Sequence, residues 1–180
     1  DVQLEQQRGP TCLVAAAVIA ASARGAKLDM NTFVRSTPVF PDGVHPYDLT
    51  VTASKLGLSS LIFRGPPEAA ARLVRAGFAP IALVASGAGR HAVVVTGVRR
   101  TEVPADDSNA TLELRLADPS QHTHNWVSAN TFGTQQSGQQ MIVLFQETER
   151  DTLNSHGFPT KIAAQMDAQF RAETLFRRAL

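Results

Sequence analysis

Cysteine is scarce in this chain: its 180 residues include one, Cys12. A single cysteine cannot form an internal disulfide, so cysteine usage does not indicate a redox compartment. Long apolar runs are also missing, since the longest, Leu13–Ala21, is too short to cross a bilayer. Charge is balanced at a formal +1 with no Lys/Arg-rich run, which provides no broad field for nucleic acid or a membrane surface. We therefore expect no nucleic-acid partner and no membrane insertion.

A secretory signal is absent from the first residues, which lack a basic region followed by an apolar one. We expect that a signal peptide either was removed, which would place the protein in the periplasm or outside the cell, or never existed, which would leave it in the cytoplasm. Hydrophobic residues make up 43% and charged residues 18% of the chain, as in an ordinary folded protein. This length suits one domain with a real core.

The first half of the sequence predicts helices. Residues 13–24 are Ala-rich, apolar nearly all round and followed by Gly25, which indicates a buried helix. Further helices are predicted over 28–36, 46–56 and 66–76, and a short strand over 58–63.

The second half predicts strands at 79–86, 91–98, 110–119 and 140–146, each bounded by turn-forming residues. Helices followed by an antiparallel sheet make an α+β fold. Apolar residues recur at helical spacing over 161–180. We expect a domain at 1–150 and a C-terminal helical extension or linker at 151–180, which packs outside the domain or contacts another domain or partner protein.

The position of Cys12 is the first indication of chemistry. Gly9, Pro10 and Thr11 do not continue a helix backwards, so the buried helix is predicted to begin near Cys12. The free N–H groups of a first turn favour a thiolate, which is the nucleophilic form of cysteine. A lone cysteine beside apolar residues is usually an inert core residue. The residues around Cys12 therefore decide whether it is interpreted as core or as a nucleophile.

Three further residues give Cys12 a context. Gln6 lies six residues upstream and could donate its amide to an oxyanion, while His91 is predicted to open a strand directly after a turn. Asp118 ends the next strand, where Pro119 forces a turn. Neighbouring antiparallel strands would bring Asp118 beside His91, so that the carboxylate holds the ring through the nitrogen remote from the sulfur.

This arrangement resembles the papain-like cysteine peptidases of the C39, bacteriocin-processing type, particularly stand-alone bacterial C39-like domains. The matching stretches are "QQRGPTCLVAAAVIA", "AGFAPIALV", "HAVVVTGV", "LRLADPS" and "NWVSANTF…QMIVLF", spread over roughly residues 2–146. The resemblance implies a papain-like α+β fold with Cys12 as nucleophile, His91 as general base and acid, Asp118 as the orienting residue and Gln6 in the oxyanion hole. It implies a peptide or protein substrate and needs neither metal nor cofactor.

Two alternatives keep the same fold. The triad would also serve a glutamine deamidase, a transglutaminase-like enzyme or an acyltransferase, because other nucleophiles can resolve the same thioester. A catalytically silent C39-like domain would only bind a peptide. Many relatives carry Cys-Gly-Pro, and an alignment on Gly9-Pro10 puts Arg8 at the nucleophile position, which favours the silent reading. Alignment on Cys12 keeps a glutamine at the spacing that the papain-like clan uses.

Other groupings of polar residues are weaker. His122 and His124 lie near Asp118 and could form a zinc pair, but they lack a third well-spaced ligand. The stretch "DGVHPYD" could contain an acid/base pair, but its Asp42, His45 and Asp48 fit a loop and a helix start better.

Overall fold

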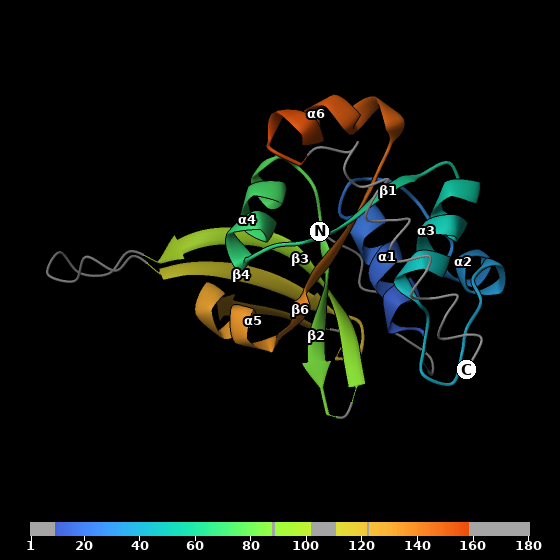
Figure 1. Ribbon diagram of the computed structural model, residues 1–180, viewed down its shortest axis with the longest axis horizontal. Helices are drawn as coiled ribbons and strands as arrows, with labels where there is room; N and C mark the ends of the chain where they lie inside the picture. The colour runs from blue at the N-terminus through green and yellow to red at the C-terminus, as the bar shows by residue number, and fades with distance from the viewer. Residues whose placement is uncertain (1–9, 88, 102–110, 122, 159–180) are drawn as a thin grey trace, which may run out of the picture.

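The computed structural model describes residues 10–87, 89–101, 111–121 and 123–158, and its arrangement is shown in Figure 1. The helices described are α1 (Cys12–Ser22), α2 (Met30–Ser36), α3 (Pro46–Lys55), α4 (Pro67–Arg75), α5 (Ala129–Gln135), a 3-10 turn η1 (Glu147–Glu149) and α6 (Arg150–Ser155). The strands are β1 (Ser59–Arg64), β2 (Ile81–Ser86), β3 (Gly89–Thr101), β4 (Thr111–Asp118), β5 (Thr123–Ser128) and β6 (Gln136–Phe145).

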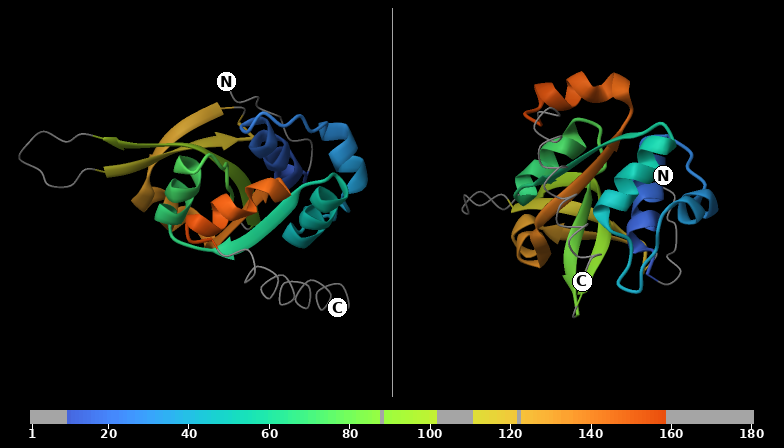
Figure 2. Two further views of the ribbon diagram at one scale, coloured as in Figure 1. Left: turned by 90° about the horizontal axis from the view of Figure 1, so that it is seen from above. Right: turned by 45° about the vertical axis from the view of Figure 1, so that its right-hand side comes forward.

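The strands form one antiparallel sheet in the order β1-β6-β2-β3-β4-β5. Helices α1, α2 and α3 lie on one face of it, and α4 and α5 lie on the other (Figures 1 and 2). The predicted α+β fold, with N-terminal helices packed on an antiparallel sheet, is confirmed. The predicted helix over 161–180 lies outside the described residues.

Alternation along the central strand β3 produces the two cores. Ala92 and Val94 pack with α1 on one face, whereas Val93 and Val95 pack toward α4 on the other. Helix α1 is buried from Leu13 to Ala21, as its apolar sequence predicts, and Gly25 follows it with φ 77°. Cys12 is therefore the first residue of a helix that is otherwise almost entirely core.

Local signals explain most of the other boundaries. The Asp29 side chain accepts a hydrogen bond from the Thr32 N–H and caps α2, and Pro46 and Pro67 are each the first residue of a helix. Several predicted boundaries differ by a few residues, and the one that bears on the site is the start of β3, which lies at Gly89 and not at His91. The hairpin pairing with β2 continues to Ser86 opposite Gly89, so His91 is the third residue of the strand.

Two elements were not predicted as such, β5 and α5. Strand β5 is an edge strand with no fully buried residue, so it lacks the apolar alternation that marks a strand. Helix α5 contains Gly133 and is capped by Ser128, whose side chain accepts from the Thr131 N–H. The Phe132 side chain is fully buried and packs this short helix against the core.

Candidate active site

Helix α1 presents Cys12 at its N-terminus, as predicted. Thr11 is the N-cap residue but its side chain forms no capping hydrogen bond, and the first turn carries no acidic residue. The sulfur, which is partly buried, instead takes hydrogen bonds from the backbone N–H groups of Leu13 and Ala92. The positive end of the helix is thus directed at the thiol rather than neutralised by a capping side chain.

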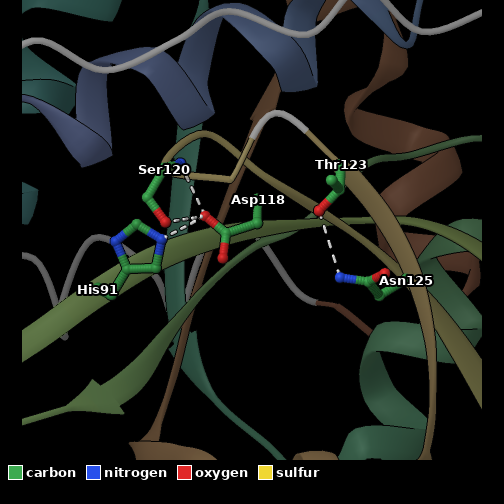
Figure 3. Close-up of polar contacts among 5 residues, drawn as sticks. All are labelled: His91, Asp118, Ser120, Thr123 and Asn125. Carbon is green, nitrogen blue, oxygen red and sulfur yellow. Dashed lines mark hydrogen bonds and ion pairs between the residues drawn. The ribbon is translucent and has the colours of Figure 1, made fainter.

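Strands β3 and β4 bring His91 and Asp118 together. Val94 is paired with Ala117, which makes Asp118 the diagonal neighbour of His91 across the two strands. The His91 Nε2 and Asp118 Oδ1 atoms lie 2.7 Å apart, and both side chains are largely buried (Figure 3). His91 also forms a side-chain hydrogen bond with Cys12, so its ring bridges the thiol and the carboxylate.

Ser120 is a further part of the site that the sequence reasoning missed. Its backbone N–H and its hydroxyl both donate to Asp118 Oδ1, at 2.8 and 2.7 Å (Figure 3). The available signal was the sequence Asp-Pro-Ser, because an aspartate often accepts the N–H of the residue two positions on. In this turn, Pro119 has no N–H of its own to offer.

The charges of the three residues support one another. Burial raises the pKa of the Cys12 thiol, but hydrogen bonds from His91, Ala92 and Leu13 outweigh it and the net pKa is lowered. The hydrogen bond with Cys12 is the largest cause that raises the pKa of His91 to about 8, with Asp118 adding to it against burial. Burial raises the pKa of Asp118, but hydrogen bonds from Ser120 and His91 lower it by more, so the net pKa is lowered. These shifts all act in the direction of a thiolate–imidazolium–carboxylate row, because each charged form is stabilised by its neighbour.

The thiol opens into a cleft of about 430 Å³. One wall is the segment Asp42–Pro46 before and at the start of α3, and the other is the β2–β3 hairpin with Gly89 and Arg90. His45 precedes Pro46 at the start of α3, and Asp48 is buried within that helix. The expectation of a loop and a helix start for these residues is confirmed. Cys12 itself lines the cleft.

Several predicted site residues are not tested by this geometry. Gln6, Arg8 and His122 lie outside the described residues. His124 is in β5, and the described segments contain no group of three or more His, Cys, Asp or Glu side chains arranged to hold a metal ion. None of the helices described is long and apolar enough to cross a membrane.

Comparison with solved structures identifies the fold. The peptidase domain of Streptococcus ComA, a bifunctional ABC transporter of a quorum-sensing pathway, superposes with a TM-score of 0.62 at 15% identity, over 82% of this chain and 100% of that domain. The fold is C39-like. A double-glycine-motif protease from an AMS/PCAT transporter, solved with its leader peptide, has a TM-score of 0.59 at 15% identity, over 80% of this chain and 91% of that one.

A third neighbour is the N-terminal C39-like peptidase domain of a toxin-secretion ATP-binding protein from Vibrio parahaemolyticus. It has a TM-score of 0.53 at 14% identity, over 78% of this chain and 99% of that domain. No protein-family model and no curated protein matches this chain. The predicted papain-like, C39-type architecture is therefore confirmed at the level of fold, and the activity of this C39-like chain is a separate question.

Proposed function

We propose that this C39-like domain is a cysteine peptidase in which Cys12, His91 and Asp118 form the catalytic triad. The observation that carries the proposal is the row of contacts from the Cys12 thiol through His91 to Asp118 at the mouth of a cleft. The residue types, the chain positions and the polarised thiol are those that acyl transfer by cysteine requires.

The mechanism begins with proton transfer from the Cys12 thiol to His91. The thiolate attacks the carbonyl carbon of the substrate, and the resulting oxyanion accepts hydrogen bonds from the backbone N–H of Cys12 and the side chain of Gln6. Collapse of this intermediate breaks the C–N bond as His91 gives its proton to the leaving amine. Water, deprotonated by His91, then releases the acyl group from the thioester and regenerates the thiol.

The substrate is proposed to be a peptide or protein segment. The cleft is not enclosed, and it runs between the segment Asp42–Pro46 and the β2–β3 hairpin, which leaves room for an extended chain. The likeness to a protease solved with a leader peptide supports the same class of substrate.

Replacement of Cys12 tests the proposal. Cys12→Ala should abolish cleavage of a peptide library, read as new N-termini by mass spectrometry, and leave the melting temperature nearly unchanged because the side chain is only partly buried. Iodoacetamide should modify wild-type Cys12 at neutral pH faster than free cysteine, because its pKa is lowered.

Four outcomes would contradict the peptidase proposal in different ways. Ammonia release without new N-termini would indicate deamidation, and acyl products with added amines would indicate acyl transfer. A thiol that reacts no faster than free cysteine would indicate a silent peptide-binding domain. A sharp fall in melting temperature for Cys12→Ala would make Cys12 a core residue.

A further inference from the structure

The environment of the Asp118 carboxylate shows an arrangement beyond the triad. One oxygen, Oδ1, accepts three hydrogen bonds: from His91 Nε2 at 2.7 Å, from the Ser120 N–H at 2.8 Å and from the Ser120 hydroxyl at 2.7 Å (Figure 3). Ser120 itself is exposed, whereas the Asp118 side chain is 14% exposed. A surface serine therefore contributes two of the three donors that hold a buried carboxylate oxygen.

This arrangement restricts the rotation of the carboxylate. Asp118 is the last residue of β4, so the sheet holds the chain before it but not the chain after it. Pro119, the next residue, has no N–H to donate. The backbone N–H of Ser120 closes the turn, which is a structural role that almost any residue could fill. The hydroxyl is different, because it adds a side-chain donor from a second direction to the oxygen that faces His91.

We propose that the Ser120 hydroxyl is a positioning device for the triad: it keeps Asp118 Oδ1 directed at His91 Nε2, and through it keeps the His91 ring directed at Cys12. The inference rests on the proposed function in assigning His91 and Asp118 to the triad. Ser120 touches neither the thiol nor the cleft, so it acts entirely through Asp118.

The expected effect follows from the energy of one hydrogen bond. Water can replace the lost hydroxyl in Ser120→Ala, but it is not tethered, so the carboxylate spends part of its time turned away from Nε2. Because water at this exposed serine offsets part of the loss, we take the range of an ordinary hydrogen bond, roughly two- to tenfold in an equilibrium, rather than the larger range for a charged acceptor. The imidazolium of His91 is then stabilised less by the Asp118 carboxylate, so the pKa of His91 falls. As a result, less Cys12 is present as thiolate at neutral pH.

Other charged groups around His91 set the background of this measurement. Cys12 comes from α1 and Asp118 from β4, while Arg90 of β3 and the pair Asp42 and His45 line the same cleft. None of these residues is altered by a change at Ser120, so a shift in the pKa of His91 reports the Asp118 contact.

The experiment measures two quantities that do not require a substrate: the pKa of the His91 ring by NMR titration and the rate of Cys12 alkylation by iodoacetamide against pH. Ser120→Ala should lower the His91 pKa and slow alkylation near neutral pH by roughly two- to tenfold. Ser120→Thr, which keeps the hydroxyl, should retain wild-type values. Ser120→Val, which has the shape of that threonine but no hydroxyl, should behave as Ser120→Ala. Ser128→Ala, which removes the cap of α5, is the matched control and should change neither quantity.

Coupling to Asp118 decides between positioning and a merely structural role. In an Asp118→Ala background, Ser120→Ala should have no further effect on the His91 pKa or on alkylation. Unchanged values in Ser120→Ala alone, or an effect of equal size in both backgrounds, would overturn the inference. Failure of the peptidase assay with this coupling intact would reject the proposed function and leave the Ser120 assignment standing.

Discussion

Cys12, His91 and Asp118 are ordinary residues whose chemistry comes from their neighbours. The nine residues that follow Cys12 in α1 are core, and the thiol differs from them because a helix N-terminus and an imidazole share its surroundings. The His91 ring is in turn held by a carboxylate that is itself fixed by Ser120. The pKa of each group is therefore shifted by the next one along the row.

The pKa of His91 predicts a pH dependence of stability. Since folding raises this pKa from 6.5 to about 8, protonated His91 stabilises the folded state fully below pH 6.5, and its contribution is lost as the pH rises through about 8. His91→Gln should therefore lower the free energy of unfolding more at pH 6 than at pH 9, as measured by urea denaturation. His156→Gln, on the exposed end of α6, is the control. Equal destabilisation at both pH values would contradict the raised pKa.

Gln6 is the predicted oxyanion donor, and its effect should be specific to turnover. Gln6→Ala should reduce kcat by about 10²–10³, as expected for the loss of one oxyanion-hole donor. It should leave the alkylation rate of Cys12 nearly unchanged, because alkylation forms no oxyanion. The adjacent Gln7→Ala is the control and should be mild. If Gln7 is the sensitive residue, the predicted spacing is wrong by one; if neither matters, the silent alignment on Arg8 gains support.

How much of the site the sequence predicted depends on how each residue is marked in it. Cys12 was marked by being the only cysteine, and Asp118 by the proline that follows it. His91 was located by the turn before its strand, although the strand begins two residues earlier. Ser120 was missed because a serine after Asp-Pro looks like any surface turn, and only the fold shows that its hydroxyl shares an oxygen with His91.

Among the helices and strands, those with local signals were predictable and those stabilised by neighbours were not. Helices α2, α3 and α4 carry a capping side chain or a proline at their starts. Helix α5 also has a capping side chain, from Ser128, but it is seven residues long and contains Gly133, and β5 lacks an alternation of buried apolar residues. They form because β4 provides a ladder for the strand and the core receives Phe132 from the helix. Tertiary contacts therefore decide the elements that sequence periodicity does not.

Strands β3, β4 and β5 meet closely at Gly97. A Cβ placed there would lie 3.0 Å from the Arg115 Cβ and 3.3 Å from the Trp126 Cη2, beside a register shift in the pairing of β3 with β4. The guanidinium of Arg99 also lies 4.2 Å from the centre of the indole ring. The indole is therefore packed across the strands, although Trp126 is partly exposed.

Gly97→Ala should destabilise the protein by about 1–3 kcal/mol, because neither strand can move away without disturbing the ladder. Trp126 is the only tryptophan, so its fluorescence should change in the folded state of this variant. Thermal unfolding followed by fluorescence measures both effects. Arg100→Ala, at an exposed position of the same strand, should leave both nearly unchanged. A variant with wild-type stability and emission would show that the strands are less closely packed here.

At the scale of the whole molecule, the segment that follows β6 packs back against the rest of the domain. Arg24, in the turn after α1, donates to the Leu144 carbonyl at 2.9 Å and pairs with Glu149 of η1. Leu153 and Phe158 are buried in the core on the α4 side, and the Phe158 ring lies 5.3 Å from that of Phe63. The predicted domain boundary at residue 150 falls directly before these two buried side chains.

Phe158→Ala should lower the free energy of unfolding by about 3–5 kcal/mol, the usual cost of removing a buried phenylalanine. Thr152→Ala, an exposed change in α6, should stay within about 0.5 kcal/mol. Urea denaturation at pH 7 compares the two. If Phe158→Ala is as mild as Thr152→Ala, the compact unit ends near residue 150 as predicted from the sequence.

The proposed triad is assembled from elements far apart in the chain, with Cys12 on α1 and Asp118 at the end of β4. During synthesis, the ribosome releases the nucleophile first and the carboxylate long afterwards, and domains fold as units once enough chain has emerged. The nascent thiol therefore has the reactivity of an ordinary cysteine until β3 and β4 have paired. For the proposed peptidase, activation of the thiol therefore comes late in synthesis, after most of the domain has emerged.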